Sequence, residues 1–327
     1  MGGLRWTQED WLDEATAWIR DRVAVAGEIE QPHVRWWSTV LRVPTRDGPV
    51  WFKATAPSYR FEAALVAALA EWRPGDGVPL IATDTERGWI LMADGGTRLR
   101  EVFARDPDPA RWAEIYPGYA QLQIDLAARR EEMVALGVPT LPLDELAPAV
   151  HRVLDDSDAL LLGEAEGLTS EQHERLRQID VGELADRLAA YGIPESLQHD
   201  DLHDGNVFLH DGDYRIFDWG DSVISHPFHS LVVGLRATAW KFKLEPGAPV
   251  LVRLRDSYLE PWTAFASRSE LLEAFALAYR LGTLARALAW YRHLEMRASA
   301  VGDRDDAESI PYGLRLFLEN GPVGSWR

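Results

Sequence analysis

This sequence contains no cysteine and no long run of apolar residues. The absence of cysteine excludes disulfide bonds, thiolate-zinc sites and a cysteine nucleophile. No stretch approaches the length of about 20 apolar residues that a membrane-spanning helix needs. Residues 1–6 also lack the apolar core of a signal peptide. We therefore expect a cytoplasmic protein.

Basic residues are scarce relative to acidic ones. The chain has 34 Lys and Arg against 52 Asp and Glu, which gives a formal net charge of −18. Such a surface repels nucleic-acid phosphates and anionic membranes, so we expect neither as a partner. Solubility accounts for most of this charge, and a cationic substrate is compatible with it.

Hydrophobic periodicity divides the 327 residues into two parts. The first part, residues 1–94, predicts an N-terminal lobe with a helix after an apparent capping box at Thr7, a second helix over 61–72, and strands at 33–37, 39–43, 50–53, 80–83 and 88–92. The triplet Asp94-Gly95-Gly96 then breaks the chain. We place the lobe boundary there.

The second part, residues 95–327, predicts a larger and mostly helical lobe. One hairpin, 207–209 against 214–217, interrupts helices expected over 112–136, 170–178, 181–191 and 270–294. The fold class is therefore α+β and bilobal, with a small antiparallel sheet in the first lobe.

The segment from Gln198 to Asp221 carries the chemistry. Within it, Asp201 and Asn206 are separated by four residues, and a hairpin then leads to a second carboxylate, Asp218. Phosphoryl transfer needs a carboxylate beside the attacking hydroxyl and hard oxygen ligands for Mg²⁺. This pattern supplies a base and a metal ligand from one loop and a second acidic group from the next.

The same segment resembles the catalytic and metal-binding loops of the aminoglycoside phosphotransferase family, which is related to choline kinases and more distantly to protein kinases. The usual family pattern is His-Gly-Asp-Leu-His-x-Gly-Asn, followed by Ile-Asp-Trp-Gly-Asp. The resemblance implies a protein-kinase-like fold that uses ATP and Mg²⁺. It also implies that Asp201 is the catalytic base, and that Asn206 and Asp218 are Mg²⁺ ligands.

Two departures from the family pattern stand out. Asp200 replaces the middle glycine, so two carboxylates are adjacent, and a role for Asp200 stays open. Asp204 stands where proline is frequent, and it is either exposed or in contact with a cationic substrate. We expect His199 and His203 to hydrogen bond the backbone, in preference to a zinc or hydrolase site. The alternative for the whole segment is an acidic loop, rich in Asp and His, that binds a metal ion or nothing.

Kinase-like folds also need a strand lysine that holds the α- and β-phosphates and a helix carboxylate that positions it. Lys53 ends an apolar strand, and Glu62 lies early in the following helix. The structural alternatives are a solvent-facing strand end for Lys53 and a favourable charge at a helix start for Glu62. The motif in the segment from Gln198 to Asp221 favours a role in nucleotide binding for both Lys53 and Glu62.

The remaining nucleotide contacts are expected at two places. No glycine-rich loop is present, but Ser38 and Thr39 could offer N–H groups and hydroxyls to phosphate, or could be ordinary turn residues. Backbone groups near Met92 and Ala93 resemble those of the strand and hinge that grip adenine. A buried strand that runs into a loop is compatible with that role.

The acceptor is expected to be a small molecule with a hydroxyl group: an aminoglycoside or other antibiotic, an amino sugar, or a choline-like alcohol. Antibiotic resistance and housekeeping metabolism are equally open. Candidate acceptor contacts in the helical lobe are Arg236, Trp240, Asp256, Tyr258, Glu260, Trp262, Glu273 and Tyr279. The alternative function is a nucleotide-binding pseudokinase that acts as a sensor or scaffold.

Overall fold

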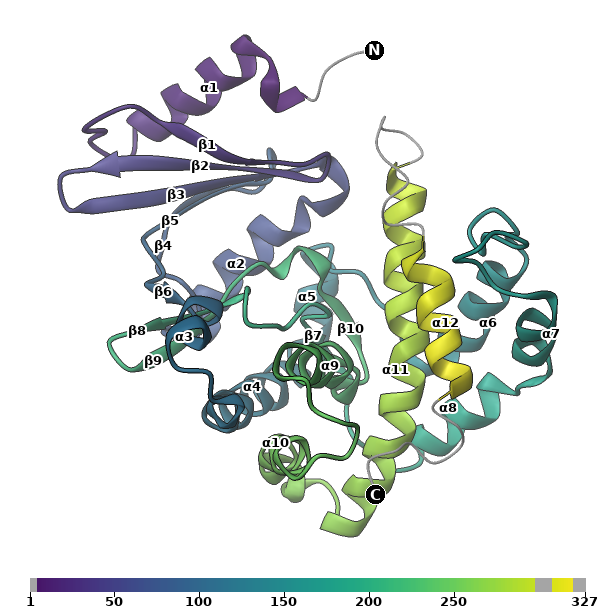
Figure 1. Cartoon of the computed structure of the whole chain (residues 1–327). Coiled ribbons are helices and arrows are strands. Elements are labelled where there is room, and N and C mark those ends of the chain that lie inside the picture. The colour runs from purple at the N-terminus through teal and green to yellow at the C-terminus, as the bar shows by residue number, and fades with distance from the viewer. Residues whose placement is uncertain (1–4, 298–307, 320–327) are drawn as a thin grey trace.

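The computed structural model describes residues 5–297 and 308–319. Its N-terminal part is an antiparallel five-stranded sheet with the order β1-β2-β3-β5-β4, and helix α1 lies over one face of this sheet while α2 lies on the other side (Figure 1). The bounds are α1 Glu9–Arg20, β1 Glu30–Val34, β2 Ser38–Thr45, β3 Gly48–Thr55, α2 Phe61–Trp72, β4 Leu80–Asp84 and β5 Trp89–Met92. The predicted order of helix, three strands, helix and two strands is confirmed.

Aromatic packing holds α1 on the sheet. Phe52 of β3 is fully buried, and its ring lies 5.4–6.3 Å from those of Trp11, Trp18 and Trp89. Tilted and edge-to-face contacts of this kind stabilise a core beyond the area that they bury. The period of 3.6 residues in α1 and of two residues in the strands brings these rings to one interface.

Two local predictions in this lobe are wrong. Thr7 does not form a capping box: it lies in a 3-10 turn, and α1 begins at Glu9 after Gln8, which makes no side-chain cap. The buried ring of Trp6 fixes this turn, because its indole N–H donates to the carbonyl of Arg35 at 2.8 Å. Trp37 was expected to be in a strand, but β1 ends at Val34 and leaves it in the loop before β2.

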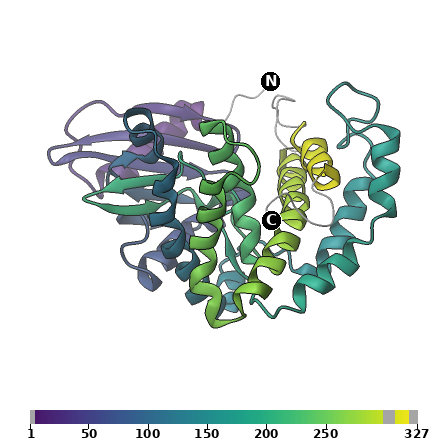
Figure 2. The same cartoon turned by 60° about the horizontal axis from the view of Figure 1, so that its bottom comes forward.

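The C-terminal part is mostly helical, and the long helix α11 runs through it beside α6, α8, α9 and α12 (Figures 1 and 2). One prediction here is wrong: the helix expected over 112–136 ends at Ala127 and restarts at Arg130. The helices are α3 Leu99–Arg105, α4 Trp112–Ala127, α5 Arg130–Ala135, α6 Leu143–Leu154, α7 Ser170–Gln178, α8 Val181–Ala189, α9 Leu231–Phe242, α10 Pro249–Leu259, α11 Arg268–Arg297 and α12 Ser309–Glu319.

Short strands in this part bring the two sequence motifs together. The predicted hairpin is present as β8 (Val207–His210) and β9 (Asp213–Ile216), and β6 (Thr97–Arg98) pairs with β8. Strand β7 (Ser196–Gln198) pairs with β10 (Val223–Ser225) so that Gln198 lies opposite Val223. Because β7 ends where the first motif begins and β10 starts where the second ends, the two loops lie side by side.

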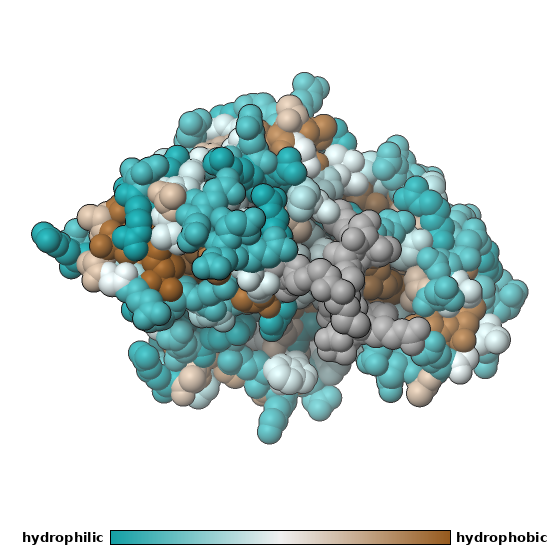
Figure 3. All heavy atoms as spheres, turned by 90° about the horizontal axis from the view of Figure 1, so that it is seen from above, coloured by the Kyte–Doolittle hydropathy of each residue, from teal (hydrophilic) through white to brown (hydrophobic). Residues whose placement is uncertain are grey.

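Buried apolar side chains form two separate clusters, one around the α1–sheet interface and one in the helical part. This arrangement agrees with two lobes, although the boundary itself, residues 1–94 against 95–327, stays a prediction. The face viewed in Figure 3 is mainly hydrophilic, with apolar groups scattered over it. Within the described residues, no helix is both long and apolar enough to cross a membrane.

Candidate active site

A cleft of about 810 Å³ lies where the sheet meets the helical part of the chain. Strand β3 and helix α2 contribute to its upper wall, and the two motif loops form its floor. Five residues singled out from the sequence line it together: Lys53, Glu62, Asp201, Asn206 and Asp218.

Lys53 of β3 joins the two sides of the cleft. Its Nζ atom lies 2.6 Å from Oε1 of Glu62 on α2 and 2.5 Å from Oδ1 of Asp218. Burial alone would lower the pKa of Lys53, but the carboxylates of Asp218 and Glu62 raise it above its ordinary range. Burial raises the pKa of Glu62, whose side chain is only 2% exposed. The expected ion pair is therefore present, and its role toward phosphate stays a prediction.

The Asp201 carboxylate is held by several neighbours. Nδ2 of Asn206 donates to its Oδ2 at 3.0 Å and to its main-chain oxygen at 2.9 Å. Nε2 of His203 lies 3.3 Å from Oδ2, and Nη2 of Arg286 lies 3.3 Å from Oδ1. Burial opposes ionisation, but His203 and Arg286 hold the pKa of Asp201 below its usual range. The side chain is therefore an ionised acceptor with a fixed orientation.

The two histidines of the loop hydrogen bond the backbone, as expected. Nε2 of His199 lies 2.9 Å from the carbonyl of Phe217, and its Nδ1 accepts from the N–H of Asp201 at 3.3 Å. Burial lowers the pKa of His199, so the neutral ring can donate from one nitrogen and accept at the other. In its neutral form, His203 accepts from the N–H of Gly205 at 2.8 Å, whereas the charged ring can only donate. His199 thereby ties the first motif loop to the second.

The oxygen donors of Asn206 and Asp218 fit Mg²⁺. Because Nδ2 of Asn206 is directed at Asp201, the amide oxygen is directed elsewhere, and Asp218 uses only Oδ1 for Lys53. The two residues are close, since Phe217 donates its N–H to the Asn206 carbonyl at 3.2 Å. Burial opposes ionisation of Asp218, but Lys53 keeps its pKa below the usual range. An amide and an ionised carboxylate are the hard ligands that Mg²⁺ prefers.

The two departures from the family pattern have structural partners. Asp200 is buried with a left-handed backbone, φ +61°, and its Oδ1 accepts from Nε2 of Gln198 at 2.7 Å. Asp204 is in an ion pair with Lys241 of α9, whose Nζ lies 2.7 Å from Oδ2. The alternative that Asp204 is exposed is wrong, because its side chain is only 18% exposed and is paired with a cation of the chain itself. Contact with a cationic substrate stays a prediction.

The expected nucleotide contacts are only partly at the cleft. Ser38, Met92 and Ala93 line it, and the Ala93 N–H already donates to the carbonyl of Pro79 at 2.9 Å. The carbonyl of Ala93 is therefore the better candidate for reading a base edge. Thr39 is fully buried, and its hydroxyl donates to the carbonyl of His33 at 2.8 Å. Its side chain is turned toward the sheet, away from any phosphate.

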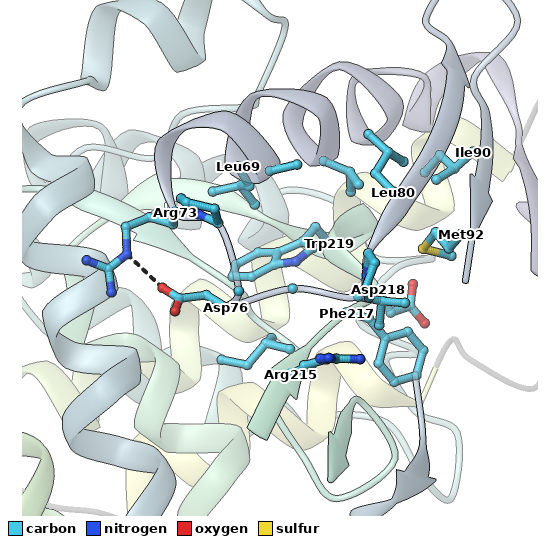
Figure 4. A pocket seen from close by; sticks show the side chains of 18 of the residues that line it. Leu69, Arg73, Asp76, Leu80, Ile90, Met92, Arg215, Phe217, Asp218 and Trp219 are labelled. Carbon is cyan, nitrogen blue, oxygen red and sulfur yellow. Dashed lines mark hydrogen bonds and ion pairs between the residues drawn. The ribbon is translucent and has the colours of Figure 1, made fainter. Parts of the chain in front are cut away.

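A second cavity of about 330 Å³ lies behind Lys53 and Met92, against α2 (Figure 4). Leu69, Leu80 and Trp219 are among the apolar side chains that surround it, and the Arg73–Asp76 ion pair lies at one side. Lys53, Glu62, Val78, Met92, Phe217 and Asp218 line both spaces. The Lys53–Glu62 pair thus borders both the larger cleft and this mainly apolar space.

None of the eight acceptor candidates proposed from the sequence lines the cleft. Tyr258, Trp262 and Tyr279 are buried in the core of the helical lobe, and Glu273 accepts a hydrogen bond from the hydroxyl of Tyr191. Other residues, which were not proposed as site residues from the sequence, do line the cleft; among them are Trp37, Tyr59, Asp221, Arg286, Ala289, Trp290 and His293. Four of them, Arg286, Ala289, Trp290 and His293, follow one another at helical spacing on α11. The spacing can be read from the sequence, but only the tertiary fold determines that this face of the helix is turned toward the cleft.

The family is decided by comparison with known sequences. The profile of the phosphotransferase enzyme family, APH, matches residues 28–271. The chain belongs to this family. As an APH phosphotransferase it is an enzyme, a small-molecule kinase. Among curated proteins, none matches the sequence significantly.

Solved structures show that this APH phosphotransferase has the α+β protein-kinase-like fold. A choline/ethanolamine kinase family protein from Mesorhizobium loti matches with a TM-score of 0.61 and 18% identity, over 94% of this chain and 95% of that one. Choline kinase LicA from Streptococcus pneumoniae matches with 0.61 and 13%, over 94% and 99%. Amicoumacin kinase hAmiN, in complex with AMP-PNP and Ca²⁺, matches with 0.56 and 11%, over 95% of each chain.

Proposed function

We propose that this enzyme transfers the γ-phosphate of ATP, in the presence of Mg²⁺, to a hydroxyl group of a small molecule. The observation that carries this proposal is the meeting of Lys53, Glu62 and Asp218 with Asp201 and Asn206 in one cleft. A nucleotide kinase needs each of these groups, and residues 165 positions apart in the sequence supply the Lys53–Asp218 contact. The AMP-PNP in the amicoumacin kinase structure supports a nucleoside triphosphate as the donor.

Each of these residues would have its own role in an in-line transfer of the γ-phosphate. Lys53, held by Glu62, would neutralise the α- and β-phosphates. Asn206 and Asp218 would hold Mg²⁺, which neutralises charge that develops on the phosphates. Asp201 would orient the acceptor hydroxyl and take its proton as the new O–P bond forms and the bond to the β-phosphate breaks.

The acceptor is proposed to be an alcohol that also carries an amine, such as an amino sugar, an aminoglycoside or other antibiotic, or a choline-like compound. Trp37, Tyr59 and Trp290 line the end of the cleft near Asp221, so aromatic faces and a carboxylate meet there. Such surroundings favour a cation through charge and cation–π attraction. The choline kinase and antibiotic kinase among the similar structures support this range of acceptors.

The test is a screen for acceptor-dependent ADP release with Mg-ATP, followed by comparison of Asp201→Asn with Asp211→Asn. Asp201→Asn is expected to lower kcat by about 100-fold or more, because it removes the proton acceptor while Mg-ATP still binds. Asp211→Asn makes the same chemical change at the exposed hairpin tip, where the side chain is 91% exposed, and it should act as wild type.

Either of two results would contradict the proposal. Full transfer by Asp201→Asn would show that the assigned base is wrong. Binding of Mg-ATP with no ADP release on any acceptor of the panel would instead favour the nucleotide-binding pseudokinase.

A further inference from the structure

Arg286 is a buried cation of the cleft and lies outside both sequence motifs. It lies on α11, and its guanidinium faces the first motif loop. Nη1 donates to the main-chain oxygen of Asp200 at 2.8 Å and lies 3.4 Å from its carboxylate. Nη2 lies 3.3 Å from Oδ1 of Asp201, and Nη1 lies 3.8 Å from Asp221. The guanidinium also lies over the ring of Trp290, 5.1 Å from its centre. One cation therefore contacts three carboxylates and the backbone that carries two of them.

Asp200 explains why a cation is needed at this place. The family pattern has glycine here, which adopts a left-handed backbone at no steric cost, whereas Asp200 adopts φ +61° and adds a carboxylate that is 3% exposed. A buried carboxylate is costly unless it is paired and hydrogen-bonded. Gln198 supplies one hydrogen bond, and Arg286 supplies the opposite charge.

The two oxygens of Asp201 have different neighbours. Oδ2 contacts Asn206 and His203, which belong to the same loop, whereas Oδ1 contacts Arg286 from a helix 85 residues further along. A carboxylate held at both oxygens cannot rotate about its terminal bond without losing a contact. In phosphoryl transfer, orientation of the attacking hydroxyl contributes more than the strength of the base.

We propose that Arg286 is a positioning residue that fixes the Asp201 carboxylate toward the acceptor hydroxyl, while it also balances the buried charge of Asp200. The inference rests on the proposed function for the role of Asp201. It extends that function because it assigns the orientation of the Asp201 carboxylate to a residue of α11, which lies outside both sequence motifs.

The experiment separates positioning from charge balance with three variants and a control. Arg286→Met removes both effects, and Arg286→Lys keeps the charge but loses the forked geometry. The double variant Asp200→Gly/Arg286→Met removes the buried carboxylate together with its partner, so it should fold even if Arg286→Met does not. Arg280→Met is the matched control, because Arg280 lies on the same helix, is buried, and stacks over Phe317 at 4.4 Å.

The double variant is expected to recover the melting temperature lost in Arg286→Met, yet to keep a kcat about 100-fold below wild type with an unchanged KM for ATP. Arg286→Lys should recover part of kcat. Arg280→Met should lower the melting temperature without changing kcat. A crystal structure of the double variant should show Asp201 turned away from Asn206, a result that does not depend on activity.

Wild-type kcat in the double variant would overturn the proposal, because Arg286 would then serve only to balance Asp200. An Asp201 carboxylate unchanged in the crystal structure of that variant would overturn it as well. Failure of the proposed function is distinguishable from both, since it would appear in the wild-type enzyme as absence of acceptor-dependent ADP release, while the crystal structure would still decide the role of Arg286.

Discussion

The hydroxyl of Tyr59 lies 2.6 Å from Nδ1 of His293 and joins the two lobes of the enzyme at one end of the cleft. Tyr59 follows strand β3, whereas His293 lies on α11. Burial raises the pKa of Tyr59 above its ordinary range, so the hydroxyl keeps its proton and can donate it to the imidazole. The rings of Trp36 and Trp37 lie 4.6 and 5.2 Å from that of His293. The contact is therefore flanked by aromatic groups and partly buried.

Tyr59→Phe is expected to lower the free energy of unfolding by about 1 kcal/mol, because a partly buried hydrogen bond between the lobes is lost. Urea denaturation of the enzyme without nucleotide measures this change. Tyr312→Phe is the matched control, since its hydroxyl is bonded to Arg236 on an exposed side chain. The control should change stability little, and an equal loss in both variants would contradict the prediction.

Lys53→Met is expected to weaken both folding and nucleotide binding. Glu62 would lose its counter-charge while buried, a change that costs about 3 kcal/mol of stability. The double variant Lys53→Met/Glu62→Gln should regain much of this stability, because no uncompensated charge is left on α2. It should not regain affinity for Mg-ATP, because the phosphates still lack their lysine. Titration calorimetry and thermal melting measure the two effects, and wild-type affinity in the double variant would refute the role given to Lys53.

The stability of the enzyme should fall as the pH rises through about 9, where His203 titrates. Burial lowers the pKa of His203, but the neighbouring carboxylates of Asp201 and Asp204 raise it to about 9. Since the unfolded value is about 6.5, the charged ring stabilises the fold fully below pH 6.5, and this contribution is lost as the pH rises through the folded value. Denaturation between pH 6 and 10, without nucleotide or Mg²⁺, measures the decline.

His203→Gln should reduce the decline of stability over this pH range. His210→Gln should leave it as in wild type, because the ring of His210 is more exposed and lies 3.4 Å from the carboxylate of Asp211 at the hairpin tip. An equal decline in wild type and His203→Gln would exclude His203 as its source.

Local patterns in the sequence predicted those parts of the fold that local forces determine. Helix α2 has the predicted bounds of Phe61–Trp72, since its apolar face continues without interruption until Pro74. The motif residues Asp201, Asn206 and Asp218 were singled out by their resemblance to the loops of the family, and one loop and one hairpin bring them to the same cleft. Trp37 was misplaced because packing against His293, far along the chain, outweighs its strand propensity.

The proposed acceptor side of the site could not be predicted from the sequence, because it depends on which face of a helix is turned toward the cleft. Tyr258 and Trp262 have the composition of a recognition site, but they face the core of the helical lobe. Arg286 and Trp290 face the cleft, and nothing in their local sequence distinguishes them from other residues of α11. Only the tertiary packing of α11 against the motif loops selects them.

Helix α11 sets a fixed length between the two halves of the site. Arg286 and His293 are seven residues apart, so their Cα atoms are separated by about 10.5 Å along the helix axis, on nearly the same face. One of these residues contacts the base loop and the other contacts Tyr59 in the opposite lobe. If the N-terminal lobe rotated while the Tyr59–His293 hydrogen bond was kept, it would turn about that hydrogen bond. Because helix α11 would hold this point, the distance from that point to Asp201 would stay constant in any such rotation.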